Sequence, residues 1–288
     1  MMRWGAGGES GRAAAMTPFS IAGAEAGGAR LLVIAGPCVI EDAAMCLEVA
    51  AHMKQACARR GLPFVFKASY RKANRSSPTT FSGLPVEEAL AILARVRQEL
   101  HVPIITDVHD EHEVAPAAEV ADALQIPAFL SRQTGLLVAA ARTGRAVNVK
   151  KGQFLAPDDM RQVVAKLTGA GCTQILLTER GTSFGYHDLV VDMRGLVTMR
   201  DFGWPVVYDA THSLQRPGGV ESGGDRRYAI PLMRAAVACG VDGVFFETHP
   251  DPARAKSDAA TQLPLAQAEL FLDEACRVRE AVVERAHA

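Results

Sequence analysis

The chain has 288 residues, of which 49% are hydrophobic and 22% are charged, and its formal net charge is −1. This length and composition allow a large buried core, arranged as one barrel or as two smaller domains. The near-neutral charge argues against a dedicated nucleic-acid surface, and no segment reaches the roughly 18 uninterrupted apolar residues that a membrane span needs. We therefore expect an ordinary soluble protein that binds neither nucleic acid nor a bilayer.

The cysteines and the N-terminal segment both indicate a cytoplasmic location. The first thirty residues are rich in Gly and Ala and lack the apolar stretch of a secretory signal. Six cysteines are scattered without paired spacing in a chain too long to need disulfides, which is typical of a reducing compartment. They are Cys38, Cys46, Cys57, Cys172, Cys239 and Cys276.

The N-terminal region is expected to contain a disordered extension and a short hairpin. Residues 1–17 are interpreted as the extension, in which Met16 is a candidate start, and residues 18–288 as a single catalytic domain. A hairpin is predicted from about Phe19 to Ile34, with its turn near Gly27 and Gly28.

From Leu31 onward, short apolar runs alternate with helical patterns. The eight runs are LLVIAGP, PFVFKAS, PIITDVH, DALQIPA, AVNVKKG, TQILLTE, PVVYDAT and DGVFFET. Helices are predicted at about 43–60, 86–99, 111–120, 134–142, 158–169, 228–239 and 263–286. This alternation favours an α/β fold, a (β/α)8 TIM barrel whose bottom the N-terminal hairpin closes, and a doubly wound open sheet is the main alternative.

Almost every predicted strand ends in a residue capable of chemistry. These residues are Cys38, Lys67, Asp107, Gln125, Lys150, Arg180, His212 and Glu247. Because the C-terminal ends of parallel barrel strands open onto one face, a single site would collect all eight.

A local group of cations predicts a site for anionic ligands. The stretch FKASYRKANRSSP, residues 66–78, places Lys67, Lys72 and Arg75 beside two hydroxyl side chains. Lysines are usually solvated surface groups, but Lys67 and Lys150 lie in apolar strands, where an unpaired charge is costly unless it faces the barrel mouth. Together with Arg180, these groups would suit a ligand that carries both phosphate and carboxylate.

Cys38, His212, Glu247 and Asp258 are candidate metal ligands, although no local spacing motif supports them. Taken singly, each has an ordinary structural explanation: a small buried thiol, a turn residue, a paired carboxylate and a helix N-cap. Their convergence on neighbouring strands of a closed barrel favours a shared divalent ion. Mixed sulfur, nitrogen and oxygen ligation suits Zn or Fe(II), with Mn or Co as alternatives.

Two loop segments are interpreted as lids over the predicted site. One is the glycine-rich stretch 213–227, and the other runs from Gly181 to Gly203. The charges at 110–113 and at Arg226 and Arg227 are interpreted as solvated faces or lid charges. Neither a GxGxxG fingerprint nor a Walker loop occurs, which argues against dinucleotide or ATP chemistry.

The motifs between about Leu31 and Leu272 resemble those of the 3-deoxy-D-manno-octulosonate 8-phosphate synthase family. They occur in the family's order and places. They are IAGPCVIE, FKASYRKANRSSP, ITDVH, LQIPAFLSRQT, NVKKGQFLAP, TERGTSFGY, YDATHSLQRPGG and FFETHPDPARAKSDAATQLPL.

The resemblance implies roles for individual residues. A cysteine at position 38 is similar to the metal-dependent class, whereas metal-independent relatives carry asparagine there. By resemblance, the metal ligands are Cys38, His212, Glu247 and Asp258. The implied phosphoenolpyruvate-binding residues are Lys67, Lys72, Lys150 and Arg180, and the arabinose 5-phosphate contacts are Asn74, Arg75 and Ser76. Asp107 and Gln125 would line the same pocket, and the expected catalytic residues are Lys67, Lys72, Asp107, Gln125, Lys150 and His212.

Arg132 resembles a residue that reaches the sugar phosphate across a subunit boundary, so a homotetramer is implied.

The implied reaction condenses phosphoenolpyruvate with D-arabinose 5-phosphate and water to give 3-deoxy-D-manno-octulosonate 8-phosphate and inorganic phosphate, for lipopolysaccharide biosynthesis. The nearest alternative is 3-deoxy-D-arabino-heptulosonate 7-phosphate synthase, which uses erythrose 4-phosphate. The KANRSS segment argues against it, because that enzyme typically carries a Lys-Pro-Arg-Thr type of motif there. A barrel that binds sugar phosphates without catalysis is a further alternative.

Overall fold

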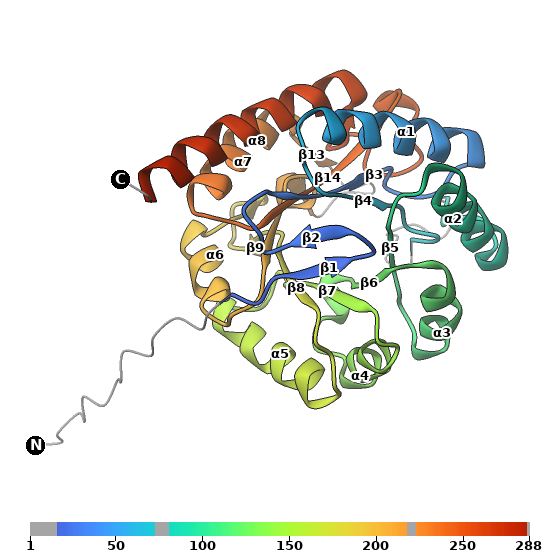
Figure 1. Cartoon of the computed structure of the whole chain (residues 1–288), viewed down its shortest axis with the longest axis horizontal. Helices are drawn as coiled ribbons and strands as arrows, with labels where there is room; N and C mark the ends of the chain where they lie inside the picture. Colours follow the sequence, from blue (N-terminus) through green and yellow to red (C-terminus); the bar gives the residue numbers. More distant parts are fainter. Residues whose placement is uncertain (1–15, 73–80, 218–222, 287–288) are drawn as a thin grey trace, which may run out of the picture.

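A computed structural model describes residues 16–72, 81–217 and 223–286. Eight parallel strands pair in chain order, and the last strand pairs with the first, so the sheet closes into a barrel (Figure 1). They are β3 (Leu32–Gly36), β4 (Phe64–Lys67), β5 (Ile104–Asp107), β6 (Ala123–Ile126), β7 (Ala146–Lys150), β8 (Ile175–Glu179), β11 (Val206–Asp209) and β14 (Gly243–His249). The predicted TIM barrel is therefore confirmed, and the open-sheet alternative is excluded.

A ring of α-helices surrounds the strands (Figure 1). They are α1 (Ala43–Arg59), α2 (Val86–Leu100), α3 (Glu111–Val120), α4 (Thr134–Arg142), α5 (Met160–Gly169), α6 (Met193–Arg200), α7 (Ala229–Ala238) and α8 (Leu265–Ala286). Each buries apolar residues against the outward side chains of the strands in the main hydrophobic core. The sequence pattern predicted all of these helices except α6.

Strict alternation along the strands decides which side chains enter the barrel. In β4, Phe64 and Phe66 join the outer core, whereas Val65 faces the interior. The same period of two turns Lys67 inward. Gly36, at the end of the neighbouring β3, makes room for this arrangement, because a Cβ at that position would collide with the carbonyl oxygen of Lys67. The alternation thus places apolar side chains in the N-terminal half of the barrel interior and ionisable side chains in its C-terminal half.

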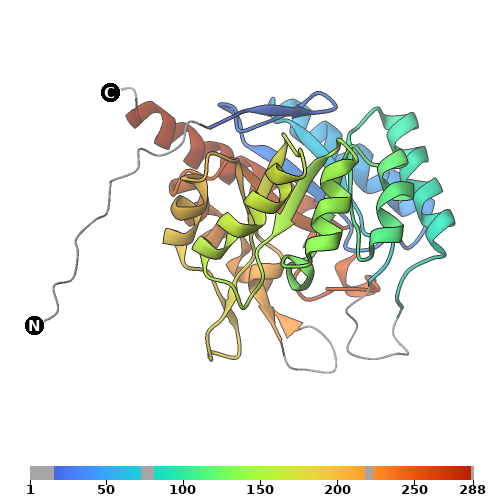
Figure 2. The same ribbon diagram turned by 90° about the horizontal axis from the view of Figure 1, so that it is seen from below.

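A two-stranded hairpin, β1 (Phe19–Ile21) and β2 (Ala24–Ala26), covers the N-terminal end of the barrel (Figure 2). Its buried residues pack against interior side chains such as Val65 and Phe245. The predicted start of the hairpin at Phe19 is confirmed, whereas its predicted turn and end were wrong. The turn falls at Ala22 and Gly23, both at positive φ, and Ile34 belongs to barrel strand β3.

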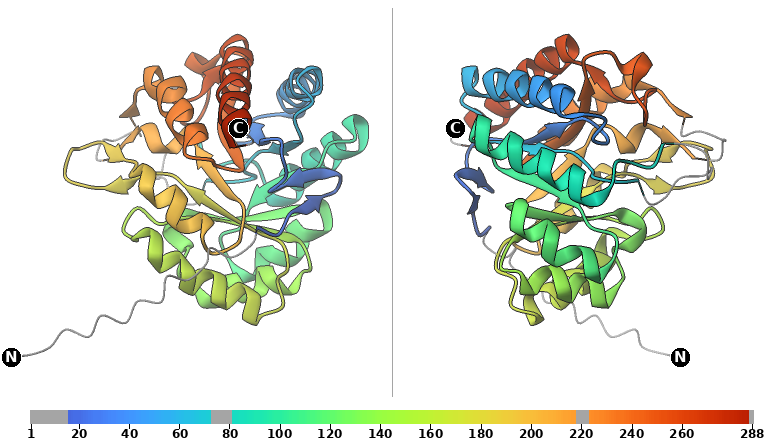
Figure 3. Two further views of the ribbon diagram at one scale, coloured as in Figure 1. Left: turned by 60° about the vertical axis from the view of Figure 1, so that its left-hand side comes forward. Right: turned by 90° about the vertical axis from the view of Figure 1, so that its right-hand side faces the viewer.

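Short elements extend the loops at the opposite, C-terminal end (Figures 2 and 3). They are the strands β9 (Thr182–Ser183), β10 (Leu189–Val190), β12 (Gln215–Arg216), β13 (Gly223–Gly224) and β15 (Leu263–Pro264), and the 3-10 turns η1 (Ala128–Leu130), η2 (Pro157–Asp159), η3 (His212–Leu214), η4 (Arg226–Tyr228) and η5 (Pro252–Arg254). The interpretation of 181–203 as one lid was wrong. The β9–β10 hairpin projects from the rim, but α6 is a barrel helix with Leu196 and Met199 fully buried.

Candidate active site

The predicted site residues gather around one cavity of about 310 Å³ at the C-terminal end of the barrel. Its lining combines side chains from four strands, β4 to β7, with side chains from the loops after these strands and after β8 and β11. The lining residues are Lys67, Ser69, Arg71, Lys72, Asp107, His109, Gln125, Pro127, Ala128, Phe129, Leu130, Lys150, Gln153, Arg180 and His212. The reactive residues at the strand ends, from Lys67 to His212, therefore line one face of the barrel.

A second cavity, of about 350 Å³, lies beside the N-terminal ends of β3 and β4 and the last turns of α8. Its arginines have structural contacts. Arg60 pairs with Asp273, and Arg279 donates to the carbonyl oxygens of Gly28, Ala29 and Val241. Because barrel enzymes place their chemistry at the C-terminal face, the first cavity is the candidate active site.

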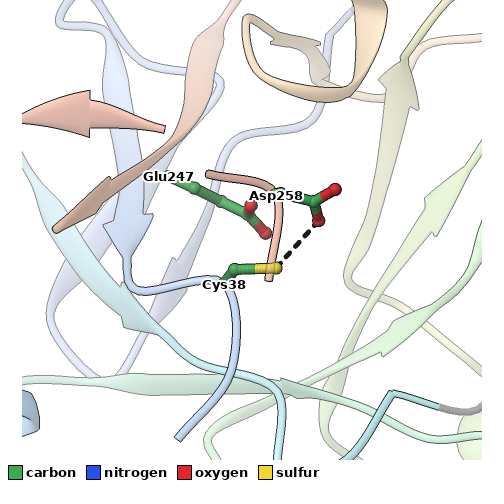
Figure 4. A group of neighbouring side chains, drawn as sticks. All are labelled: Cys38, Glu247 and Asp258. Carbon is green, nitrogen blue, oxygen red and sulfur yellow. Dashed lines mark hydrogen bonds between the residues drawn. The ribbon is translucent and has the colours of Figure 1, made fainter. Parts of the chain in front are cut away.

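Cys38 lies in the loop after β3, Glu247 in β14 and Asp258 in the loop beyond β14, and the three side chains converge (Figure 4). One potential ligand atom from each lies within 4.8 Å of the others. The Cys38 thiol donates to Asp258 Oδ2 at 2.9 Å, and burial, with Asp258 and Glu247 next, raises the thiol pKa. Glu247 Oε2 is buried without a hydrogen-bond partner among the described residues. This donor set and the orphaned oxygen fit a divalent metal ion.

His212 is close to the same carboxylates. Its Nε2 atom lies 3.5 Å from Glu247 Oε1 and 3.9 Å from Asp258 Oδ2. Its Nδ1 atom lies 2.8 Å from Asp209 Oδ2, and Asp209 Oδ1 accepts the backbone N–H of His212. A carboxylate behind the ring fixes the orientation of an imidazole ligand. Three of the four predicted ligands thus form one close group, His212 lies beside its two carboxylates, and Asp209, which the sequence analysis did not identify, contacts the His212 ring.

Asp258 adopts an unusual backbone conformation to reach this cluster. Its φ is +47°, which is uncommon for a residue other than glycine. The strain is held by the surrounding loop, because the carbonyl oxygen of Asp258 accepts the N–H groups of Thr261 and Gln262. Its Oδ1 atom also accepts from Gln215 at 2.9 Å. Strained residues held this way are typical of functional sites.

Lys67 is a fully buried cation between two carboxylates. Its Nζ atom lies 3.4 Å from both Asp107 Oδ2 and Glu247 Oε1, and it donates to Ser69 Oγ at 2.8 Å. Burial alone would lower the lysine pKa, but Asp107 and Glu247 outweigh it and raise the pKa. Lys67 therefore carries a fixed positive charge.

Lys150 and Arg180 are further buried cations. Lys150 Nζ pairs with Asp209 Oδ2 at 2.7 Å and lies 3.7 Å from the centroid of the Phe245 ring. Burial lowers the pKa of both cations despite nearby carboxylates. Arg180 donates to Gln215 at 2.8 Å, while its NH1 group is buried without a hydrogen-bond partner among the described residues. A buried guanidinium nitrogen that has no partner among the described residues indicates an anionic ligand.

A chain of hydrogen bonds crosses the barrel interior beneath these cations. Gln125 donates to Asp107 at 2.5 Å, Asn148 donates to Gln125 at 2.9 Å, and Thr178 donates to Asn148 at 2.7 Å. Burial would raise the Asp107 pKa, but Lys67 and Lys150 hold it well below its ordinary value. This chain fixes the amide orientation of Gln125 and keeps Asp107 ionised.

Lys72 also joins the site from the loop after β4. Its Nζ atom lies 3.7 Å from Asp258 Oδ2 and 3.9 Å from Glu247 Oε1. The expected sugar-phosphate contacts lie outside the described residues: Asn74, Arg75 and Ser76. Arg132 is exposed in this chain and is not part of the cavity lining.

One charged segment, at 110–113, departs from its sequence-based interpretation as a solvated face or lid. Glu113 was expected on a solvated face, but its side chain is only 14% exposed because it pairs with Arg71 from the loop after β4. Arg216 and Arg227, from the first predicted lid, are exposed and pair with Asp188 and Asp225. Neither arginine lines the cavity.

A closed barrel that gathers buried cations and a thiol, imidazole and carboxylate cluster at its C-terminal rim defines a class of barrel enzymes that act on anionic substrates. This chain belongs to the DAHP synthetase I family, whose model matches residues 16–284. Within the described residues, no helix is both long and apolar enough to cross a membrane.

Curated relatives cover nearly the whole chain and carry the name 2-dehydro-3-deoxyphosphooctonate aldolase. The protein from Syntrophobacter fumaroxidans is 53% identical over 90% of this chain and 91% of its own length. The Trichlorobacter lovleyi protein is 54% identical over 86% and 93%, and the Nitratidesulfovibrio vulgaris protein is 56% identical over 85% and 91%. The resemblance based on the sequence motifs is thus confirmed.

Proposed function

We propose that this protein is a 3-deoxy-D-manno-octulosonate 8-phosphate synthase. The eight-carbon keto-acid phosphate in the name of its relatives is the product of that reaction. The observation that carries the proposal is the convergence of Lys67, Lys150 and Arg180 with the Cys38 cluster at one end of the barrel. Such a site suits an anionic enol substrate and a sugar aldehyde beside a metal ion.

Phosphoenolpyruvate is assigned to the buried cations. Lys67, Lys72 and Lys150 would hold its carboxylate and phosphate as point charges. The unpartnered NH1 group of Arg180 supplies a planar donor for phosphate oxygens. Asp107 and Gln125 line the same cavity, where their fixed orientations would position the reacting groups.

In the proposed reaction, the enol C3 of phosphoenolpyruvate forms a bond to the aldehyde carbon of arabinose 5-phosphate. Water adds at C2, and the resulting hemiketal phosphate loses inorganic phosphate by C–O cleavage. Holding two anions in an aligned pose can remove roughly 7 to 11 kcal/mol of barrier, so positioning by the lysines is a main contribution. Asn74, Arg75 and Ser76 are proposed to bind the sugar phosphate.

Cys38, His212, Glu247 and Asp258 are proposed to hold a divalent ion, which is Zn, Fe(II), Mn or Co. When bound, such an ion supplies Lewis acidity that can orient an aldehyde oxygen or lower the pKa of a water toward about 7. Asp209 would hold the His212 ring with Nε2 toward the cluster.

A homotetramer is proposed because Arg132 is exposed and outside the cavity of its own chain. Large aromatic side chains are exposed on the neighbouring rim loops: Phe129 (56%), Phe154 (55%), Phe184 (68%) and Tyr186 (66%). Exposed apolar groups of this kind are typical of subunit contacts.

A cytoplasmic location is also proposed, because all six cysteines are free thiols.

The test is phosphate release from phosphoenolpyruvate with either arabinose 5-phosphate or erythrose 4-phosphate, each with chelator and after Mn, Zn or Fe(II) is added back. We expect turnover only with the five-carbon sugar, lost with chelator and restored by metal. Preference for erythrose 4-phosphate would establish the heptulosonate alternative, and no phosphate release with either sugar would indicate a binding protein.

A further inference from the structure

Arg71 is a cavity-lining arginine for which neither the sequence motifs nor the family resemblance gives a role. Its NH2 group pairs with Glu113 Oε1 at 2.5 Å. The Nε group is buried and has no hydrogen-bond partner among the described residues. Leaving a buried donor of a charged group without a hydrogen bond is costly, so the Nε–H group indicates a ligand that the described residues do not supply.

The partner of Arg71 is itself held firmly. Glu113, in the first turn of α3, accepts a hydrogen bond at Oε2 from the Tyr70 hydroxyl at 2.5 Å and another from the backbone N–H of His109 at 3.0 Å. Burial would raise the Glu113 pKa, but these hydrogen bonds and Arg71 lower it. Glu113 is therefore a fixed anion with one oxygen directed to Arg71.

The backbone at Arg71 is fixed as well. Arg71 forms an antiparallel bridge with Gly83, and the N–H of Lys72 donates to Ser82 at 2.7 Å. Gly83 has φ +128°, and a Cβ there would lie 2.6 Å from the carbonyl oxygen of Tyr70. The close approach of the two backbone segments, at Tyr70 to Arg71 and at Gly83, thus requires glycine. Backbone and side chain together preorganise the guanidinium group.

The position of Arg71 indicates which anionic group it meets. The side chains of Lys67 and Lys150 are 1% and 6% exposed, whereas that of Arg71 is 40% exposed and lies toward the outside of the same cavity. The deep cations surround the candidate metal cluster, where the aldehyde must meet the enol. The phosphate of a five-carbon sugar is at the other end of its chain, so it would lie toward the outer part of the cavity.

We infer that Arg71 binds the phosphate group of the sugar phosphate and determines specificity for it, and that Glu113 is the positioning residue for Arg71. This inference rests on the proposed function, because it assumes that a sugar phosphate enters the cavity. The planar guanidinium group would donate its Nε–H to a phosphate oxygen, while its NH2 group stays with Glu113.

The first test is Arg71→Ala, compared with Arg95→Ala. Arg95 is a matched control because it pairs with Glu99 on the exposed face of α2. We expect Arg71→Ala to raise the KM for arabinose 5-phosphate roughly 10- to 100-fold, as expected for lost hydrogen bonds to a charged group. The KM for phosphoenolpyruvate should change less than about threefold, and Arg71→Lys should be intermediate because it retains charge without the fork.

The second test separates positioning from a structural role. Glu113→Gln keeps an acceptor for Tyr70 but removes the charge that faces Arg71. We expect it to raise the sugar-phosphate KM in the wild-type background and to have no further effect in an Arg71→Ala background, since its effect passes through Arg71. Equal loss for both substrates, or full additivity in the double variant, would overturn the positioning role.

Failure of this inference is distinguishable from failure of the proposed function. If the wild-type protein does not condense the two substrates, the proposed function fails and this inference fails with it. If the wild type is active and a folded Arg71→Ala variant retains the wild-type KM for the sugar phosphate, only the assignment of Arg71 is wrong. The double variant, which removes both charges of the pair, provides a second measurement if Arg71→Ala alone unfolds because Glu113 loses its partner.

Discussion

Cys38, Glu247 and Asp258 bring three acidic groups together in a buried position, an arrangement that is unfavourable when all three are ionised. A divalent ion would balance these charges, and the soft sulfur ligand would favour Zn or Fe(II) over Mg. The identity of residue 38 is therefore expected to decide how firmly metal is retained.

Replacing Cys38 by asparagine should lower the metal content after dialysis by roughly tenfold or more, because even supporting residues around a metal contribute 10- to 100-fold to affinity. Some activity is expected to survive, since the family resemblance implies asparagine at this position in metal-independent members. Elemental analysis of the purified variant measures the effect. Cys239→Ser, at the end of α7, is the control, and unchanged metal content in Cys38→Asn would disprove ligation by Cys38.

Asp209→Asn tests the support behind His212. The amide NH2 of asparagine would replace an oxygen that faces both His212 Nδ1 and Lys150 Nζ. We expect a 10- to 100-fold loss of metal affinity, measured by competition with a chromophoric chelator. Asp188→Asn, at an exposed ion pair with Arg216, should bind metal like the wild type. Wild-type affinity in Asp209→Asn would show that the carboxylate has no part in metal binding.

For single residues, position along a strand predicted the site better than residue type. Lys67 and Glu247 were identified because they interrupt apolar strands near their C-terminal ends. Asp209 stands at an equivalent position in β11 but was overlooked beside His212. Glu113 could not have been recognised from the local sequence, because an acidic first turn is typical of any exposed helix and only the tertiary contacts with Tyr70 and Arg71 bury it.

The predicted strands and most helices agree with the structure because their apolar periods are strong. The exception, α6, is eight residues long and contains Gly195, a poor helix former. That glycine is explained by packing, since a Cβ there would lie 2.7 Å from Pro157 Cγ of η2. Such a contact between neighbouring βα units is not visible in the sequence. The hairpin turn was also misplaced, because the Gly27 and Gly28 pair was interpreted as the turn, whereas the chain turns at Ala22 and Gly23.

Ile21→Ala tests the hairpin as a stabilising cap. Ile21 is 1% exposed and packs against the apolar bottom of the barrel interior. We expect a loss of about 2 to 4 kcal/mol in the free energy of unfolding. The kcat and KM values should stay within about twofold of the wild type, because the active site is at the other end. Urea unfolding and steady-state kinetics measure both, with exposed Glu25→Gln as the control; loss of activity without loss of stability would contradict this division.

For the whole molecule, the proposed tetramer predicts complementation between damaged subunits. Arg132→Ala and His212→Ala should each be strongly impaired as homogeneous proteins. If Arg132 acts in a neighbouring site, co-expressed hybrids contain some sites with both residues intact, so activity should exceed the sum of the two parents. Phosphate release from hybrids purified through two different tags measures this. Activity equal to the sum would place Arg132 outside the neighbouring site.

The balance of charge in the cavity has a consequence for how its ligands bind. Lys67, Lys72, Lys150 and Arg180 are matched in number by Asp107, Asp209, Glu247 and Asp258. A divalent ion would leave this group positive by one unit, even after Cys38 loses its proton. The ion should therefore strengthen the binding of phosphoenolpyruvate. Since linkage is reciprocal, phosphoenolpyruvate should tighten the metal by the same factor, so each would retain the other.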